Sequence, residues 1–240
     1  MNAQDGLKLR MFATYCGLAY LVLVFGGMLL AGFLPPPSPS EPANQIAAMF
    51  TGDELRIRLG MLAIMWGALA FIPFAAVIAH YMSRIEGGFG VLSLSALLGG
   101  VGNMVLTFYP GIWWLAAAFR PDRNPEIVYV LNDACWIQLI GGVSMYDALP
   151  ISMAVAIFLD RSATPVFPRW AGFAFVFLTL TIMPDQALFF FHAGPFAWNG
   201  LLSFWMPVIA FGVWFIVSFI ILRKAVLQDR TSPQGPVPAA

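Results

Sequence analysis

Charged residues are scarce in this sequence, and their scarcity excludes most soluble folds. Of the 240 residues, 10% are charged and 60% are hydrophobic, and the mean hydropathy is +0.81. A soluble globular domain has about 25% charged residues. The 12 basic and 12 acidic residues leave a formal net charge of zero, and no stretch is basic enough to track a phosphate backbone. The composition predicts a polytopic membrane protein that does not bind nucleic acid.

Cysteine and histidine are also rare, with two residues of each. Cys16 and Cys135 lack CxxC or Cys/His spacing, so the sequence supports neither a disulfide nor a zinc site, and we interpret both as small buried residues. His80 and His192 fall at opposite ends of the predicted helices, which argues against bis-histidine haem. Asp185 and His192 have no third ligand at a suitable spacing. We therefore predict no metal and no other cofactor.

Sequence motifs of the common enzyme classes are missing. The chain has no Walker A, GxSxG or HExxH motif, and no GxGxxG followed by a strand. No lysine falls within a predicted helix, which excludes a retinal Schiff base. Whether the protein is an enzyme stays open at this point.

Long apolar runs are what the sequence has instead. The first, "MFATYCGLAYLVLVFGGMLLAGF", exceeds the apolar region of about 7 to 15 residues in a signal peptide, so we expect a retained helix. A bilayer core of about 30 Å needs about 20 apolar residues in a helix. Six segments fit this length, and each must be helical because lipid offers no partner for a free backbone N–H. They are residues 10–34, 59–82, 89–110, 134–159, 168–191 and 200–222.

These segments predict an all-α, six-helix transmembrane bundle with short interfacial helices on the outer face. We expect one membrane domain over residues 1–224 and a disordered cytoplasmic tail over residues 225–240. Lys and Arg predict the orientation, because cytoplasmic loops are enriched in them. With the N-terminus inside, eight fall on the cytoplasmic side and four outside, namely Arg56, Arg58, Arg120 and Arg123. We predict a multi-pass protein of the bacterial inner (plasma) membrane with both termini in the cytoplasm.

The outer connections are longer than the inner ones. After "PPPSPS", a short helix with Ile46, Met49 and Phe50 on one face is expected, and then Thr51 with Glu54 predicts a capping box for the second long helix. Pro110 is expected to end or kink the third helix.

The segment "GIWWLAAAF" would then lie along the membrane interface with Trp113 and Trp114 at headgroup depth. Asn124, Pro125 and Glu126 have the residue types of N-cap, N1 and N2 of the next helix.

Asp185 is the leading candidate functional residue. It follows Pro184 in "TIMPDQALFFFHAG", in the outer part of the fifth predicted span, with Gln186 beside it. A carboxylate facing lipid would cost a few kcal/mol, so we expect Asp185 to face the bundle interior. Pro184 frees a backbone carbonyl nearby. His192 follows seven residues later, two α-helical turns above on the same face. Asp185 either binds a ligand or handles a proton, or else it is a structural partner for a cation such as Arg58.

Four other polar positions are candidates for the same region. Arg58 can pair locally with Glu54 or point toward Asp185. Asn132 and Asp133 can cap, bond an outer loop or line the same cavity. Asn103 is expected to bond a neighbouring helix, and Gly99, Gly100 and Gly102 predict close helix approach there.

Asp147 has an unusual sequence context. It interrupts the fourth span in "MYDALPIS", and Asp-Ala-Leu-Pro-Ile is also what one reading frame of a common sequencing-adapter end encodes. Our hypothesis is that residues 147–151 are an assembly artefact, and an uninterrupted match to clean reads of the source DNA would refute it. We assign no mechanistic role to Asp147 or Pro150.

The order of features over residues 11–110 supports one resemblance. An apolar first helix and a Pro/Ser-rich loop precede "ANQIAAMF" and "IRLGMLAIMWGALAFIPF". In this order the chain resembles uncharacterised bacterial six-helix membrane proteins with a domain of unknown function. The resemblance implies the fold and transfers no catalytic residue.

Three functions follow as alternatives. The first is an outward-facing pocket near Asp185 that binds or acts on an apolar small molecule or a lipid. The second is a small proton-coupled transporter, although the halves of the chain show no repeat. The third is an accessory membrane subunit whose outer loops dock a partner. The lipid bilayer is the expected surrounding, and a homo-oligomer is compatible with each.

Overall fold

The computed structural model describes residues 2–120 and 122–231, and over these residues the chain is helical with no strand. Six stretches are long and apolar enough to cross a membrane, as the sequence predicted, which indicates a multi-pass membrane protein. Two of the crossings consist of a regular α-helix joined to a differently wound segment. The elements are α1 (Ala3–Ala31), α2 (Ala43–Gly52), α3 (Glu54–Glu86), α4 (Val91–Phe119), α5 (Pro125–Gly141), α6 (Ser144–Leu159), α7 (Arg169–Ile182), the 3₁₀ segment η1 (Met183–Phe190), the π segment η2 (Leu201–Trp205) and α8 (Met206–Thr231).

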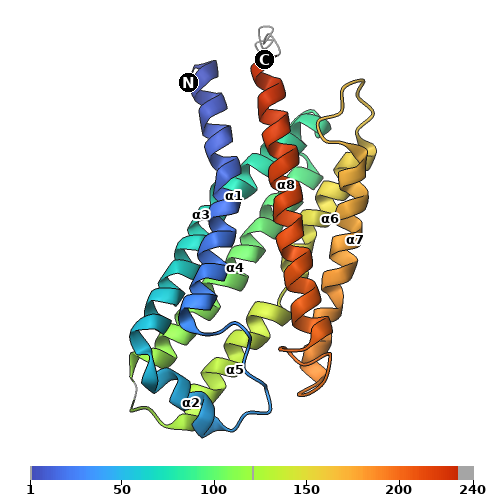
Figure 1. The fold of residues 1–240 in the computed structure, drawn as a ribbon. Coiled ribbons are helices and arrows are strands. Elements are labelled where there is room, and N and C mark those ends of the chain that lie inside the picture. The colour runs from blue at the N-terminus through green and yellow to red at the C-terminus, as the bar shows by residue number, and fades with distance from the viewer. Residues whose placement is uncertain (1, 121, 232–240) are drawn as a thin grey trace.

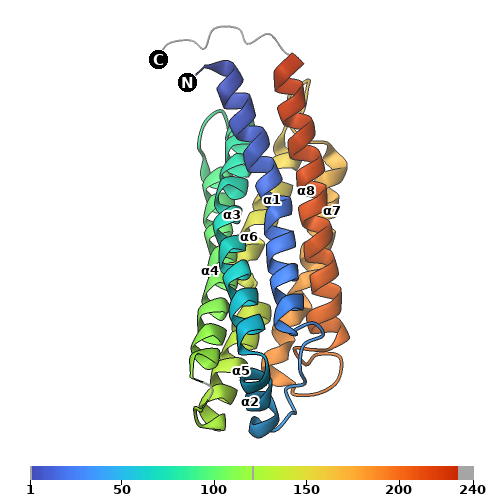
Figure 2. The same ribbon diagram turned by 60° about the vertical axis from the view of Figure 1, so that its left-hand side comes forward.

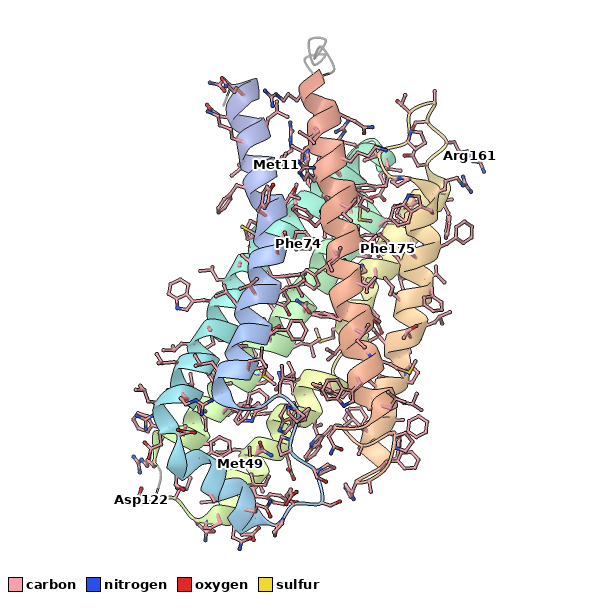
Figure 3. All side chains as sticks on the ribbon, viewed as in Figure 1. Met11, Met49, Phe74, Asp122, Arg161 and Phe175 are labelled. Carbon is pink, nitrogen blue, oxygen red and sulfur yellow. The ribbon has the colours of Figure 1, made fainter. Side chains whose placement is uncertain are left out.

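The spans form an elongated bundle with two distinct ends (Figures 1 and 2). The terminal end carries the start of α1 and the end of α8, together with residues 87–90 and 160–168. The loop end carries α2, residues 122–124 and residues 191–200. Arg161 and Asp122 mark these opposite ends in Figure 3. An even number of crossings requires both termini on one side, and the structure agrees with this parity.

Helix ends at the loop end follow local capping rules in part. As predicted, the Asn124 side chain accepts a hydrogen bond from the Glu126 N–H (2.9 Å) and Pro125 opens α5. The predicted capping box between Thr51 and Glu54 is wrong. Thr51 still belongs to the last turn of α2, and its hydroxyl donates to the carbonyl of Ala48 (3.1 Å). It therefore cannot cap the following helix.

Of the two outcomes expected at Pro110, an end of the helix or a kink, the end is wrong. α4 continues through Pro110 to Phe119. Trp114, expected at headgroup depth, is fully buried against Phe33 and Trp136, with ring centroids 5.0 and 5.1 Å apart. The packing of this last part of α4 stabilises the helix by more than the loss of one backbone hydrogen bond at the proline costs. The expected short helix does form as α2, which buries Ile46 and Phe50.

Glycine lets the long helices approach closely. A Cβ at Gly27 of α1 would come within 2.5 Å of the Gly60 carbonyl of α3. A Cβ at Gly99 would come within 2.6 Å of the Leu149 backbone N, and one at Gly102 within 2.7 Å of Met145, both in α6. The expected close approach of helices at the glycines of α4 is thus confirmed.

The end of α8 departs from the prediction of a tail from residue 225. α8 continues to Thr231, because Ala225 and Val226 are buried in the core and Asp229 binds side chains of neighbouring helices. The Asp229 carboxylate accepts hydrogen bonds from Tyr81 (2.9 Å) and Arg84 (2.7 Å) and lies 3.7 Å from Arg10. The remaining predicted tail, residues 232–240, lies outside the described residues.

Two clusters of buried apolar side chains make up the core. One cluster includes Phe74, Phe175 and Trp214, and Figure 3 places Phe74 and Phe175 midway along the bundle. The other includes Phe33, Trp114 and Trp136 and lies toward the loop end. The candidate site lies where the two clusters meet.

Candidate functional site

A cavity of about 100 Å³ lies inside the bundle and is lined almost entirely by apolar atoms. Its walls come from α1, α4, the junction of α5 with α6, the junction of α7 with η1, and the start of the last span. Tyr20 and Tyr146 contribute from the first core cluster, and Met28, Ile140 and Phe204 contribute from the second. The cavity therefore occupies the junction between the two clusters.

Three of the six spans lose regular α-helical geometry beside this cavity. α5 ends at Gly141 and α6 begins at Ser144, with Val143 lining the cavity at the break. α7 changes to a 3₁₀ winding at Met183, next to Ile182 and Asp185. The last span begins with a π segment that contributes Ser203 and Phe204.

The residue types explain these interruptions. Gly141 and Gly142 are adjacent, and glycine weakens a helix. Pro184 and Pro207 have no N–H, so the carbonyl four residues before each loses its helical donor. Irregular backbone at membrane depth is tolerated where it is buried in protein or lines a cavity, and π segments are frequent at functional sites.

Asp185 faces this cavity and is 1% exposed. Neither of its carboxylate oxygens has a hydrogen-bond partner within the described part of the chain. The N–H of Gln186 lies close to the carboxyl group but does not reach hydrogen-bonding geometry. An ionised carboxylate isolated in this way costs several kcal/mol. The arrangement requires either a proton on Asp185 or an occupant that satisfies its oxygens.

Other polar atoms lie on the same wall. The Nδ2 of Asn103 and the hydroxyl of Tyr146 are buried and have no partner among the described residues. The Tyr20 hydroxyl lies 3.0 Å from that of Thr107, which itself donates to the Asn103 carbonyl (2.7 Å). A cavity with apolar walls thus presents one carboxyl group, one amide donor and one phenol to its interior.

Asp147 lies close enough to Asp185 to act on it electrostatically. It is 4% exposed, and its Oδ1 has no partner among the residues that the structure describes. A second carboxyl group adds to the negative character of this region. Because our hypothesis is that residues 147–151 are an assembly artefact, we assign Asp147 no role in binding.

Arg58 does not meet Asp185. Its guanidinium donates to Glu54 (3.1 Å) and to the backbone carbonyl of Ala118 (2.7 Å), which lies in the last turn of α4. Of the two alternatives, the structure thus shows the local pair, extended by a bond that caps α4. An arginine at a helix C-terminus satisfies free carbonyls and interacts favourably with the helix dipole.

His192 is not placed two turns above Asp185 on the same face. The prediction assumed an α-helix, whereas residues 183–190 wind as a 3₁₀ helix and Phe191 is extended. Helical spacing therefore does not relate the two side chains, because the 3₁₀ winding ends at Phe190 and the extended Phe191 separates it from His192. His192 is exposed, and its carbonyl accepts a hydrogen bond from Ser40 (3.0 Å).

Asn132, Asp133 and Gln186 lie outside the cavity wall. Asn132 is buried and accepts a hydrogen bond from the Trp114 indole (3.2 Å), which is a structural role. Asp133 is half-buried and lines a separate hollow at the loop end together with His192. Gln186 is half-buried beside Asp185. Among the seven predicted positions, the structure brings only Asp185 and Asn103 together at the cavity.

Sequence reasoning missed four polar residues of the cavity wall: Tyr20, Thr107, Tyr146 and Ser203. Their hydroxyl groups are ordinary in membrane helices, and nothing in their spacing distinguishes them. Gly141–Gly142 and Pro207 were available signals, since each predicts a local departure from helix geometry inside a span. No protein-family model, curated protein or solved structure matches this chain.

Proposed function

We propose that this protein binds a small, mainly apolar molecule in the cavity beside Asp185. The observation that carries the proposal is the Asp185 carboxyl group, buried without a partner among the described residues in a cavity whose walls are otherwise apolar. Binding sites for small molecules combine apolar walls with a few convergent polar groups. Asp185 supplies acceptors, and Asn103 supplies a donor.

The size of the cavity limits the occupant. A cavity of about 150 Å³ accommodates benzene, so the smaller volume of about 100 Å³ suits a molecule of about five heavy atoms. A whole lipid does not fit, although the end of an acyl chain does. The volume therefore favours a small molecule over a lipid headgroup.

Filling the cavity tests this function. Val208 is half-buried on the wall, and replacing it with Phe (V208F) adds an aromatic ring where the occupant would lie. We expect organic extracts of the purified wild-type protein to contain a small molecule that extracts of V208F lack, measured by mass spectrometry. Val213, exposed on the same helix α8, gives the control V213F, which should retain the molecule. Identical extracts from all three proteins would contradict the proposal.

The interrupted spans favour transport as a second candidate. Broken helices and membrane-embedded carboxyl groups recur at the substrate sites of transporters, where helix segments move against one another. Small-molecule binding ranks first because it requires only the cavity. The test is uptake of the extracted small molecule into proteoliposomes with and without an imposed proton gradient. Uptake that depends on the gradient would establish proton-coupled transport, and equal uptake without the gradient would exclude it.

A further inference from the structure

The charge of the cavity wall selects among occupants. Of the residues that line the cavity, Asp185 is the one with a carboxyl group, and none of them is Lys, Arg or His. An anionic occupant would place two negative charges together away from water, which is unfavourable. A neutral occupant would leave the Asp185 carboxyl group without a counter-charge, so that a proton would have to neutralise it.

Within the described residues, no Lys, Arg or His forms a salt bridge or hydrogen bond with Asp185. Arg58 is bonded to Glu54 and to the end of α4 at the loop end. Arg10 and Arg84 surround Asp229 at the terminal end. His192 lies at the exposed loop end beside Asp133. The described residues therefore provide no cation for Asp185.

Aromatic rings supply a second feature that suits a cation. Tyr20 and Phe211 have ring centroids 6.1 Å apart, and Tyr146 and Phe211 have centroids 5.2 Å apart, and all three side chains line the cavity. The faces of aromatic rings attract ammonium groups. The hydroxyl of Tyr146, a residue of the cavity wall, has no partner among the described residues and is a further hydrogen-bond acceptor.

We infer that the occupant is a short aliphatic amine bound as its ammonium ion, with Asp185 as counter-ion. This inference rests on the proposed function, since it requires that the cavity bind a small molecule at all. The ammonium N–H groups donate to the two oxygens of Asp185, and the hydrocarbon part lies against the apolar wall. The same geometry disfavours carboxylates and phosphates.

Three probes that each have four carbon atoms separate the possibilities: n-butylamine, butan-1-ol and butanoate. Their binding is measured by isothermal titration to the full chain in nanodiscs, with protein-free discs as the blank. We expect n-butylamine to bind about tenfold more tightly than butan-1-ol or better, from hydrogen bonds to a charged acceptor, and butanoate to bind least. Replacing Asp185 with Asn (D185N) should remove the preference for the amine, so that n-butylamine and butan-1-ol bind the variant within about twofold of each other. Asp133→Asn, a change of the same type outside the cavity wall, is the matched control and should retain the preference.

The outcomes distinguish the inference from the function it rests on. If butan-1-ol binds the wild-type protein as tightly as n-butylamine, or if D185N retains the amine preference, the ammonium inference is overturned and the cavity remains a small-molecule site. If none of the three probes binds above the blank, the proposed function fails with it. The wild-type comparison decides between amine and alcohol even where D185N does not fold.

Discussion

Individual polar side chains differ in this protein according to whether the chain supplies their partners. Asp160 has several partners, whereas Asp185 has none within the described residues. Ser162 donates to the Asp160 carboxylate from both its backbone N–H (3.0 Å) and its hydroxyl (2.6 Å), and the Val166 N–H donates a third bond (2.9 Å). The Asp160 bonds stabilise its loop, whereas the Asp185 oxygens are available to bind an occupant of the cavity.

The Asp160 bonds predict a pH dependence of stability. Burial raises the pKa of Asp160, but the hydrogen bonds from Ser162 and Val166 outweigh it and hold the pKa below its ordinary value of 3.8. A depressed pKa means that the ionised group stabilises the folded state above pH 3.8, and that this stability is lost as the pH falls through the folded-state pKa.

We expect Asp160→Ala to lower the free energy of unfolding by about 1 to 2 kcal/mol at neutral pH. The difference from wild type should shrink when the same unfolding experiment is run well below the ordinary pKa of an aspartate. Ser162→Ala removes one of the three bonds and should have a smaller effect. A difference that stays constant over the whole pH range would show that the carboxylate charge is not the cause.

Two kinds of contact stabilise the packing of the helices: close backbone contacts at glycines, and the packing of large side chains. α1 and α3 touch through Gly27 and Gly60, whose backbones leave no room for a side chain. Small residues at such contacts allow dispersion forces to act along the whole helix in lipid, where the hydrophobic effect does not drive helix association.

Neighbouring glycines of α1 offer a matched test of this contact. Gly27→Ala should destabilise the protein by about 1 to 3 kcal/mol, because its Cβ meets the backbone of α3. Gly26→Ala should be neutral or slightly stabilising, since a Cβ there meets nothing within 4 Å. Thermal unfolding of the purified proteins measures both. Equal effects of the two substitutions would show that helix propensity, and not the α1–α3 contact, determines the change in stability.

The sequence was sufficient for the all-helical fold, the six spans and the burial of Asp185, because a charge in an apolar run is conspicuous. It was insufficient for helix ends such as Glu54, since helices continue past the apolar run into charged residues. It was also insufficient for Pro110, whose effect depends on how tightly Trp114 is packed. His192 was misplaced because a 3₁₀ segment cannot be distinguished from an α-helix by residue spacing alone.

The whole molecule has both described chain ends at one end of the bundle, and its sidedness is a prediction from charge. Ala163 at the terminal end and Ala193 at the loop end are both exposed, and each accepts a cysteine. A membrane-impermeant maleimide applied to intact bacterial cells should label Ala193→Cys, and should label Ala163→Cys only after permeabilisation. Native Cys16 and Cys135 are buried and give little background. The reverse pattern would invert the predicted topology.

The position of Asp229 has a consequence for biosynthesis. Its carboxylate joins α8 to Arg10 near the start of the chain and to Tyr81 and Arg84 at the end of α3. The ribosome makes α1 and α3 long before residue 229 emerges, so two arginines lack their counter-ion while five spans are already synthesised. A nascent chain that stops at residue 224 has all six crossings but lacks the carboxylate that ties its first helix to its last. The contacts that tie α1 and α3 to α8 can therefore form only after the last turns of α8 have been synthesised.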